Sequence, residues 1–114
     1  MRPITLLLLL LLLFGAGFLA CDGDAGFGEP CHDDRECDAM CATGGDFPGG
    51  MCTSGCDNDN HCPDDWVCVG KKGGVCAFQC GAKAACQDIF GPSWTCRDAD
   101  HQGSGGKISV CLGK

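Results

Sequence analysis

The sequence predicts a small disulfide-rich fold of three tandem four-cysteine modules, each a loop followed by a short β-hairpin, with little regular secondary structure. Thirteen cysteines among 114 residues indicate a cross-linked scaffold made in an oxidising compartment. Their spacing repeats, because Cys-x5-Cys opens each module and a double glycine shortly precedes its last cysteine. Large apolar side chains are few beyond the leader, so disulfides are expected to take over much of the role of a hydrophobic core.

Residues 1–20 predict a signal peptide of the lipoprotein type. Arg2 supplies a positive charge, and residues 6–13 are eight consecutive leucines. This apolar stretch is shorter than the roughly 20 residues of a membrane-spanning helix and is typical of a signal-peptide core. The end of the leader, Phe18-Leu19-Ala20-Cys21, resembles a bacterial lipobox. The resemblance implies that Cys21 is lipidated, with acyl chains such as palmitate that anchor the protein to a membrane.

Cysteine parity also singles out Cys21. Twelve of the thirteen cysteines fall into three groups of four, which leaves Cys21 without an intramolecular partner. An odd cysteine in an exported protein requires an explanation, and lipidation provides one. The alternative is cleavage by an ordinary signal peptidase after Gly17, which would leave Cys21 as a stray thiol on a freely secreted protein.

The remaining chain divides into a flexible tether at residues 21–30 and cysteine-rich repeats at residues 31–55, 56–79 and 80–114. The second repeat predicts a hairpin from residues 66–69 and 75–78, joined by a turn at Lys71-Lys72-Gly73-Gly74. In the third repeat we expect one or two helical turns within residues 82–90, a long mobile loop over residues 98–106 and a last strand at residues 107–112.

Twelve cysteines are expected to form six disulfides, confined to their own repeats: Cys31, Cys37, Cys41 and Cys52; Cys56, Cys62, Cys68 and Cys76; and Cys80, Cys86, Cys96 and Cys111. Four cysteines allow three pairings, and spacing does not choose among them. First-to-third with second-to-fourth is preferred, because it ties the leading loop across both hairpin strands.

Aromatic residues are placed to cover these disulfides. Trp66 and Trp94 each stand two residues before a cysteine, so the period of a strand puts indole and sulfur on one face. In the first repeat Phe47 or Met40 would take this place. Each repeat is thus expected to have its own small core.

Acidic residues recur in the leading loops. Asp34 and Asp59 each follow the first cysteine of a repeat by three positions, where we expect them to accept hydrogen bonds from backbone N–H groups. Calcium binding is the alternative, with oxygen ligands from Asp57, Asp59, Asp64 and Asp65. An EF-hand-like loop counted from Asp57 would place Cys62 and Cys68 where glycine and a carboxylate are needed, so no metal or cofactor is expected.

The repeated Cys-x2-Asp-x2-Cys followed by a third cysteine resembles the Dickkopf N-terminal or EB-type cysteine-rich module, and Cys62-Pro63-x4-Cys68 matches it best. Together with the leucine-rich leader, the chain resembles the cysteine-rich surface lipoproteins of myxobacteria. This resemblance implies a noncatalytic extracellular fold and transfers no site residue.

Charge and residue pattern narrow the function. The net charge of −7 disfavours binding to nucleic acid. His32, His61 and His101 occupy different registers of their repeats, and no serine lies in a Gly-x-Ser-x-Gly elbow, so we do not expect an enzyme. The sequence favours a lipid-anchored, noncatalytic cell-envelope protein with a binding or structural module, which binds an extracellular protein or a glycan or shields the envelope.

The alternative is a freely secreted protease inhibitor, toxin-like peptide or signalling ligand. For an inhibitor, the basic pair Lys71 and Lys72 would enter the acidic pocket of a trypsin-like protease. A solvated turn is the simpler interpretation of the two lysines.

Overall fold

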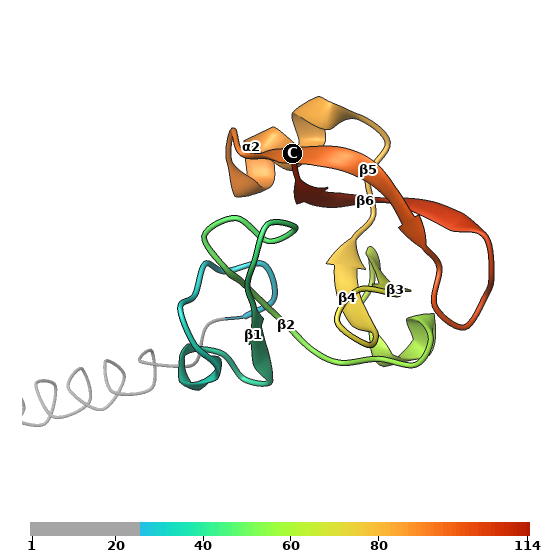
Figure 1. Cartoon of the computed structure of the whole chain (residues 1–114), viewed down its shortest axis with the longest axis horizontal. Coiled ribbons are helices and arrows are strands. Elements are labelled where there is room, and N and C mark those ends of the chain that lie inside the picture. Colours follow the sequence, from blue (N-terminus) through green and yellow to red (C-terminus); the bar gives the residue numbers. More distant parts are fainter. Residues whose placement is uncertain (1–25) are drawn as a thin grey trace, which may run out of the picture.

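The computed structural model describes residues 26–114 (Figure 1), and the predicted leader, Cys21 and residues 22–25 lie outside this range. The described chain is a small disulfide-rich fold in which three two-stranded antiparallel sheets follow one another. The strands are β1 (Met40–Ala42), β2 (Met51–Thr53), β3 (Trp66–Val69), β4 (Val75–Phe78), β5 (Trp94–Asp100) and β6 (Lys107–Gly113). The helical elements are η1 (Asp34–Glu36), η2 (Asp59–His61) and α2 (Lys83–Phe90). The prediction of short hairpins with little regular secondary structure is confirmed.

Several strands and one helix lie where the local sequence pattern predicted them. β3 and β4 begin and end at the predicted residues, α2 lies within residues 82–90, and β6 extends the predicted last strand by one residue. The β3–β4 turn uses left-handed backbone at Lys72 (φ 50°), Gly73 (φ 82°) and Gly74 (φ 115°). Glycine adopts such angles without a steric penalty, which explains the double glycine at this turn.

Each hairpin carries two disulfides. The bonds are Cys31–Cys41 and Cys37–Cys52, Cys56–Cys68 and Cys62–Cys76, and Cys80–Cys96 and Cys86–Cys111. The order is first-to-third and second-to-fourth in every case. The third and fourth cysteines lie directly opposite each other across the hairpin, as Cys68 and Cys76 do. The leading loop is therefore fastened to both strands, which is the arrangement preferred from the sequence.

A carboxylate closes this leading loop in two of the three cysteine-rich segments, which are residues 31–55, 56–79 and 80–114. Oδ1 of Asp34 accepts a hydrogen bond from the backbone N–H of Cys41 at 2.8 Å, and Oδ1 of Asp59 accepts one from Cys68 at 2.9 Å. This confirms the structural role predicted for both residues. In the third segment Lys83 replaces the aspartate, and α2 starts there.

The hydrophobic core is shared by the three hairpins, which differs from the expected set of separate small cores. One buried cluster joins apolar side chains of all three, including Phe47, Met51, Val69, Val75, Trp94, Val110 and Leu112. Phe47 is 1% exposed and meets Trp94 edge to face, with ring centroids 6.4 Å apart. A two-stranded hairpin cannot bury its apolar face alone, so packing against its neighbours is the physical reason for the shared core.

Polar contacts reinforce this packing. The Thr53 hydroxyl donates to the Cys76 carbonyl at 2.6 Å, and the Gly113 N–H donates to the Asp46 carbonyl at 2.8 Å. The Asp46 carboxylate also pairs with Lys71 at 3.4 Å and Arg97 at 3.3 Å. Asp46 therefore connects the first segment to both others.

The loop predicted over residues 98–106 is shorter in the structure and spans residues 101–106. β5 continues to Asp100, which pairs in register with Lys107, and Ala99 is buried. The end of this long hairpin lies against the second one, where the Gly70 N–H donates to the Asp100 carbonyl at 2.9 Å and the Gln102 N–H to the Cys68 carbonyl at 2.9 Å. These bonds to a distant segment order a stretch whose local composition is polar.

Candidate functional site

A six-ring aromatic chain runs through the described structure. Ring centroids are 5.2 Å apart for Phe27 and Trp66, 5.7 Å for Trp66 and Phe78, and 6.1 Å for Phe78 and Phe90. Phe90 then lies 4.9 Å from Trp94, whose ring meets Phe47 at 6.4 Å. Most of these pairs meet edge to face, the geometry that aromatic quadrupoles favour. The chain connects residues 26–30 to all three hairpins and to α2.

The outer part of this chain lines a groove with two lobes. The aromatic lobe, about 360 Å³, is lined by Phe27, Gly28, Glu29, Pro30, Trp66, Phe78, Ile89 and Phe90. The proline lobe, about 220 Å³, is lined by Gly28, Pro30, Pro48, Gly50, Ile89, Phe90 and Trp94. Within residues 26–114 the exposed large apolar side chains are Phe27 (39%) and Ile89 (55%), and both line the aromatic lobe. Apolar surface left open on a rigid scaffold is typical of a binding site.

Residues 26–30 form the N-terminal wall of the groove and are not part of the flexible tether that the sequence had suggested. The Gly28 N–H donates to the Cys52 carbonyl at 2.9 Å, and the Cys52 N–H donates to the Glu29 carbonyl at 2.8 Å. Residues 26–29 form a turn, closed by the Glu29 N–H donating to the Gly26 carbonyl at 3.2 Å, and this turn is fastened to β2 through Cys52. A Cβ on Gly28 would lie 3.1 Å from a ring carbon of Phe90, so glycine lets the backbone approach the rings closely. The sequence signal was one phenylalanine in an otherwise polar stretch.

Trp66 and Trp94 occupy different environments. Trp66 is half-buried and packs against the cysteines of its own segment, as predicted. It also forms a wall of the aromatic lobe, so it takes part in both the core and the groove. Trp94 is 3% exposed, and its neighbours Phe47 and Phe90 come from the first segment and from α2.

The three histidines lie in separate surroundings. His32 is exposed beside Glu36, and Nδ1 of His61 accepts a hydrogen bond from the Asp57 N–H at 3.1 Å. His101 is held by a carboxylate of another segment, because its Nε2 lies 2.8 Å from Oδ2 of Asp59. Within residues 26–114 no serine hydroxyl is hydrogen-bonded to a histidine.

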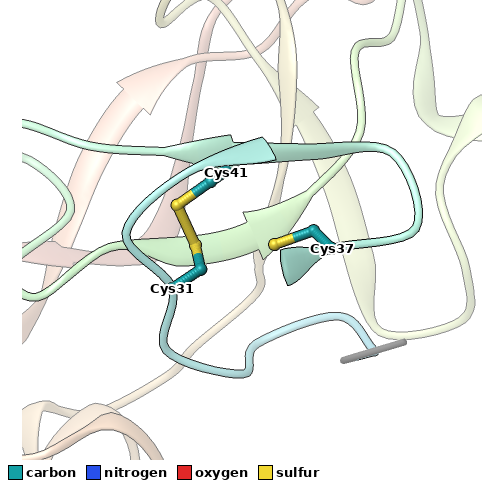
Figure 2. A group of neighbouring side chains, drawn as sticks. All are labelled: Cys31, Cys37 and Cys41. Carbon is teal, nitrogen blue, oxygen red and sulfur yellow. A yellow bond between two sulfur atoms is a disulfide. The ribbon is translucent and has the colours of Figure 1, made fainter. Parts of the chain in front are cut away.

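The described residues that could group around a metal are three cysteine trios, and all of their sulfurs are in disulfides. The trios are Cys31, Cys37 and Cys41; Cys56, Cys62 and Cys76; and Cys80, Cys86 and Cys111. Figure 2 shows the first, with the Cys31–Cys41 bond beside the sulfur of Cys37, which bonds to Cys52. A sulfur in a disulfide is not a thiolate ligand. The calcium candidates Asp57, Asp59, Asp64 and Asp65 form no such group.

The predicted partner loop is partly tied down. Nζ of Lys71 lies 3.4 Å from Oδ2 of Asp46 in the first segment, whereas Lys72 is exposed. The geometry therefore presents one free lysine at the turn rather than a projecting basic pair.

The Asp59 carboxylate has a perturbed titration. The Cys68 N–H, and then His101, lower the pKa of Asp59 below its usual value, although burial acts in the opposite direction. The Lys107 ammonium likewise lowers the pKa of Asp100 across the β5–β6 hairpin. Both carboxylates thus contact the turn-bearing end of the β5–β6 hairpin, at His101 and Lys107.

No family model, curated protein or solved structure matches this chain. The six disulfides are those of a protein from an extracellular or otherwise oxidising environment. Across residues 26–114 there is no helix with the length and apolarity needed to cross a bilayer.

Proposed function

We propose that this protein is a noncatalytic, lipid-anchored module of the cell envelope that presents the aromatic groove to an extracytoplasmic ligand. The groove is the observation that supports a binding role. Phe27 and Ile89 remain exposed at its rim, although the chain has few large apolar side chains with which to form a core. Six disulfides hold its walls, so a ligand would meet a preorganised surface.

The anchor rests on Cys21, the cysteine left over when the twelve others pair with one another. Cys21 precedes Phe27 by six residues, a length that reaches at most about 20 Å when extended. A lipid on Cys21 would thus hold the groove close to the membrane surface. Several acyl chains on one residue give stable anchoring, because a single chain binds only marginally.

We also propose that the three segments are copies of one four-cysteine module of the Dickkopf N-terminal or EB type. Two features support this: the disulfide order is the same in all three, and the aspartate bond to the third cysteine recurs in the first two. The freely secreted inhibitor gains less support, because Lys71 is paired with Asp46.

The anchor is tested by Cys21→Ser in the full chain, with labelling by an alkyne analogue of palmitate and membrane fractionation. We expect wild type to be labelled and sedimented with membranes, and the variant to be unlabelled and released. Non-reducing peptide mapping should give the same six disulfides in both. Equal membrane retention of wild type and variant would contradict the anchor.

A further inference from the structure

The aromatic lobe combines ring surfaces with one free carboxylate. Four of its lining residues are aromatic: Phe27, Trp66, Phe78 and Phe90. The face of an aromatic ring carries negative potential and attracts cations, most strongly for tryptophan. Trp66 is half-buried here, so part of its indole is accessible from the lobe.

Glu29 supplies the charge. It is an acidic residue that lines the lobe, and within residues 26–114 its carboxylate has no hydrogen-bond or ion-pair partner. No lysine or arginine lines either lobe of the groove. Lys71 and Arg97, which lie outside the groove, are paired with Asp46. The lobe is thus complementary to a positively charged ligand that also has apolar surface.

We propose that the aromatic lobe binds an organic cation of the quaternary ammonium class, with its methyl groups against the rings and its charge near Glu29. Such a group has no N–H to satisfy, which suits a lobe lined mainly by apolar side chains. The volume of about 360 Å³ accommodates a trimethylammonium group and the chain that bears it. This inference names the ligand of the proposed binding function and rests on it.

The test compares choline with its uncharged isostere 3,3-dimethylbutan-1-ol, using the full chain in a maltoside detergent. The readouts are Trp66 indole shifts in NMR spectra and intrinsic fluorescence. We expect saturable binding of choline that is about tenfold or more tighter than that of the alcohol, because only the cation gains from the rings and the carboxylate. Equal affinities, or no saturable response to choline, would overturn the proposal.

Two variants assign the site. Glu29→Gln should weaken choline binding about two- to fivefold and leave the alcohol unchanged, since it removes an exposed charge and no apolar surface. Glu36→Gln is the matched control, because Glu36 is an exposed glutamate outside the groove, and it should change neither. Phe27→Leu removes a ring that is 39% exposed and should weaken choline binding without loss of the six disulfides. Choline binding that is unaffected by both Glu29→Gln and Phe27→Leu would place the cation elsewhere.

Binding to vesicles distinguishes a lipid head group from a small solute as the source of the cation. Phosphatidylcholine vesicles that bind Cys21→Ser protein and compete with free choline would identify a lipid head group, whereas choline binding without vesicle binding would identify a small solute. Concentration-dependent dimerisation that is abolished by Phe27→Leu would assign the lobe to a second copy and overturn the inference. Choline binding does not require the anchor, so binding by Cys21→Ser protein keeps this inference testable if lipidation fails.

Discussion

The carboxylate of Asp59 lies 2.8 Å from Nε2 of His101, on the turn between β5 and β6. The same carboxylate accepts the Cys68 N–H at 2.9 Å, so it closes the loop of its own segment and holds the tip of another. Both contacts favour the ionised form, and the pKa of Asp59 is lowered. A residue predicted to have a local role thus also joins two hairpins.

This contact predicts an acid-sensitive contribution to stability. Because the folded-state pKa of Asp59 lies below its ordinary value of 3.8, the contribution is present above pH 3.8 and is lost as the pH falls through the folded pKa. We expect Asp59→Asn, which keeps an acceptor for Cys68, to lower the free energy of unfolding at pH 7 by about 1 kcal/mol or less, since the carboxylate is 39% exposed. Urea titrations from pH 7 to pH 3 should show the two proteins converging below about pH 4. A constant difference across this range would count against the ionised contact.

The double glycines predict that a glycine-to-alanine substitution will cost different amounts of stability in the three segments. A Cβ on Gly50 would lie 1.9 Å from the Cys31 carbonyl oxygen, and one on Gly74 would lie 2.3 Å from that of Cys56. Gly106 has left-handed backbone too (φ 74°) but meets nothing within 4 Å. Gly106→Ala should therefore cost only the backbone strain, about 1–2 kcal/mol. Gly50→Ala and Gly74→Ala should cost more than this or prevent oxidative folding, as measured by the yield of protein with six disulfides. Equal yields for all three would refute the close approach.

Local patterns in the sequence were enough to predict the hairpins and the disulfide scaffold, because strand period, turn glycines and cysteine spacing act within about 25 residues. The shared core was not predictable in the same way. Phe47 was assigned to its own repeat, yet its partner Trp94 lies in the third segment. The groove was missed for the same reason, since Phe27 and Trp66 become neighbours only when Gly28 and Glu29 bond to Cys52 of β2. Contacts between distant segments depend on the packing of whole hairpins, which spacing does not encode.

The shared core predicts that the hairpins unfold together. Phe47→Ala should lower the free energy of unfolding by about 3–5 kcal/mol, because it removes a fully buried ring. The indole N–H signal of Trp94 in NMR spectra, followed in denaturant and resolved from that of Trp66, should report this loss from the third segment. Phe27→Ala is the control, and it should cost much less because Phe27 is 39% exposed. A Trp94 transition at the wild-type midpoint in Phe47→Ala would mean that the hairpins unfold independently.

Removal of different disulfides should lower the free energy of unfolding by different amounts. Cys86–Cys111 spans 25 residues and belongs to the shared core, with both residues fully buried. Cys31–Cys41 spans 10 residues and lies in a separate cluster of four cysteines. Chain entropy alone gives about 3.5 kcal/mol for the longer loop and about 2.7 kcal/mol for the shorter. Replacing Cys86 and Cys111 by alanine also removes packing from the shared core, so we expect its total cost to exceed that of the Cys31 and Cys41 pair by about 2 kcal/mol. Thermal unfolding of the two double variants measures this difference, and a larger loss on removal of Cys31–Cys41 would show that the first segment, not the shared core, limits stability.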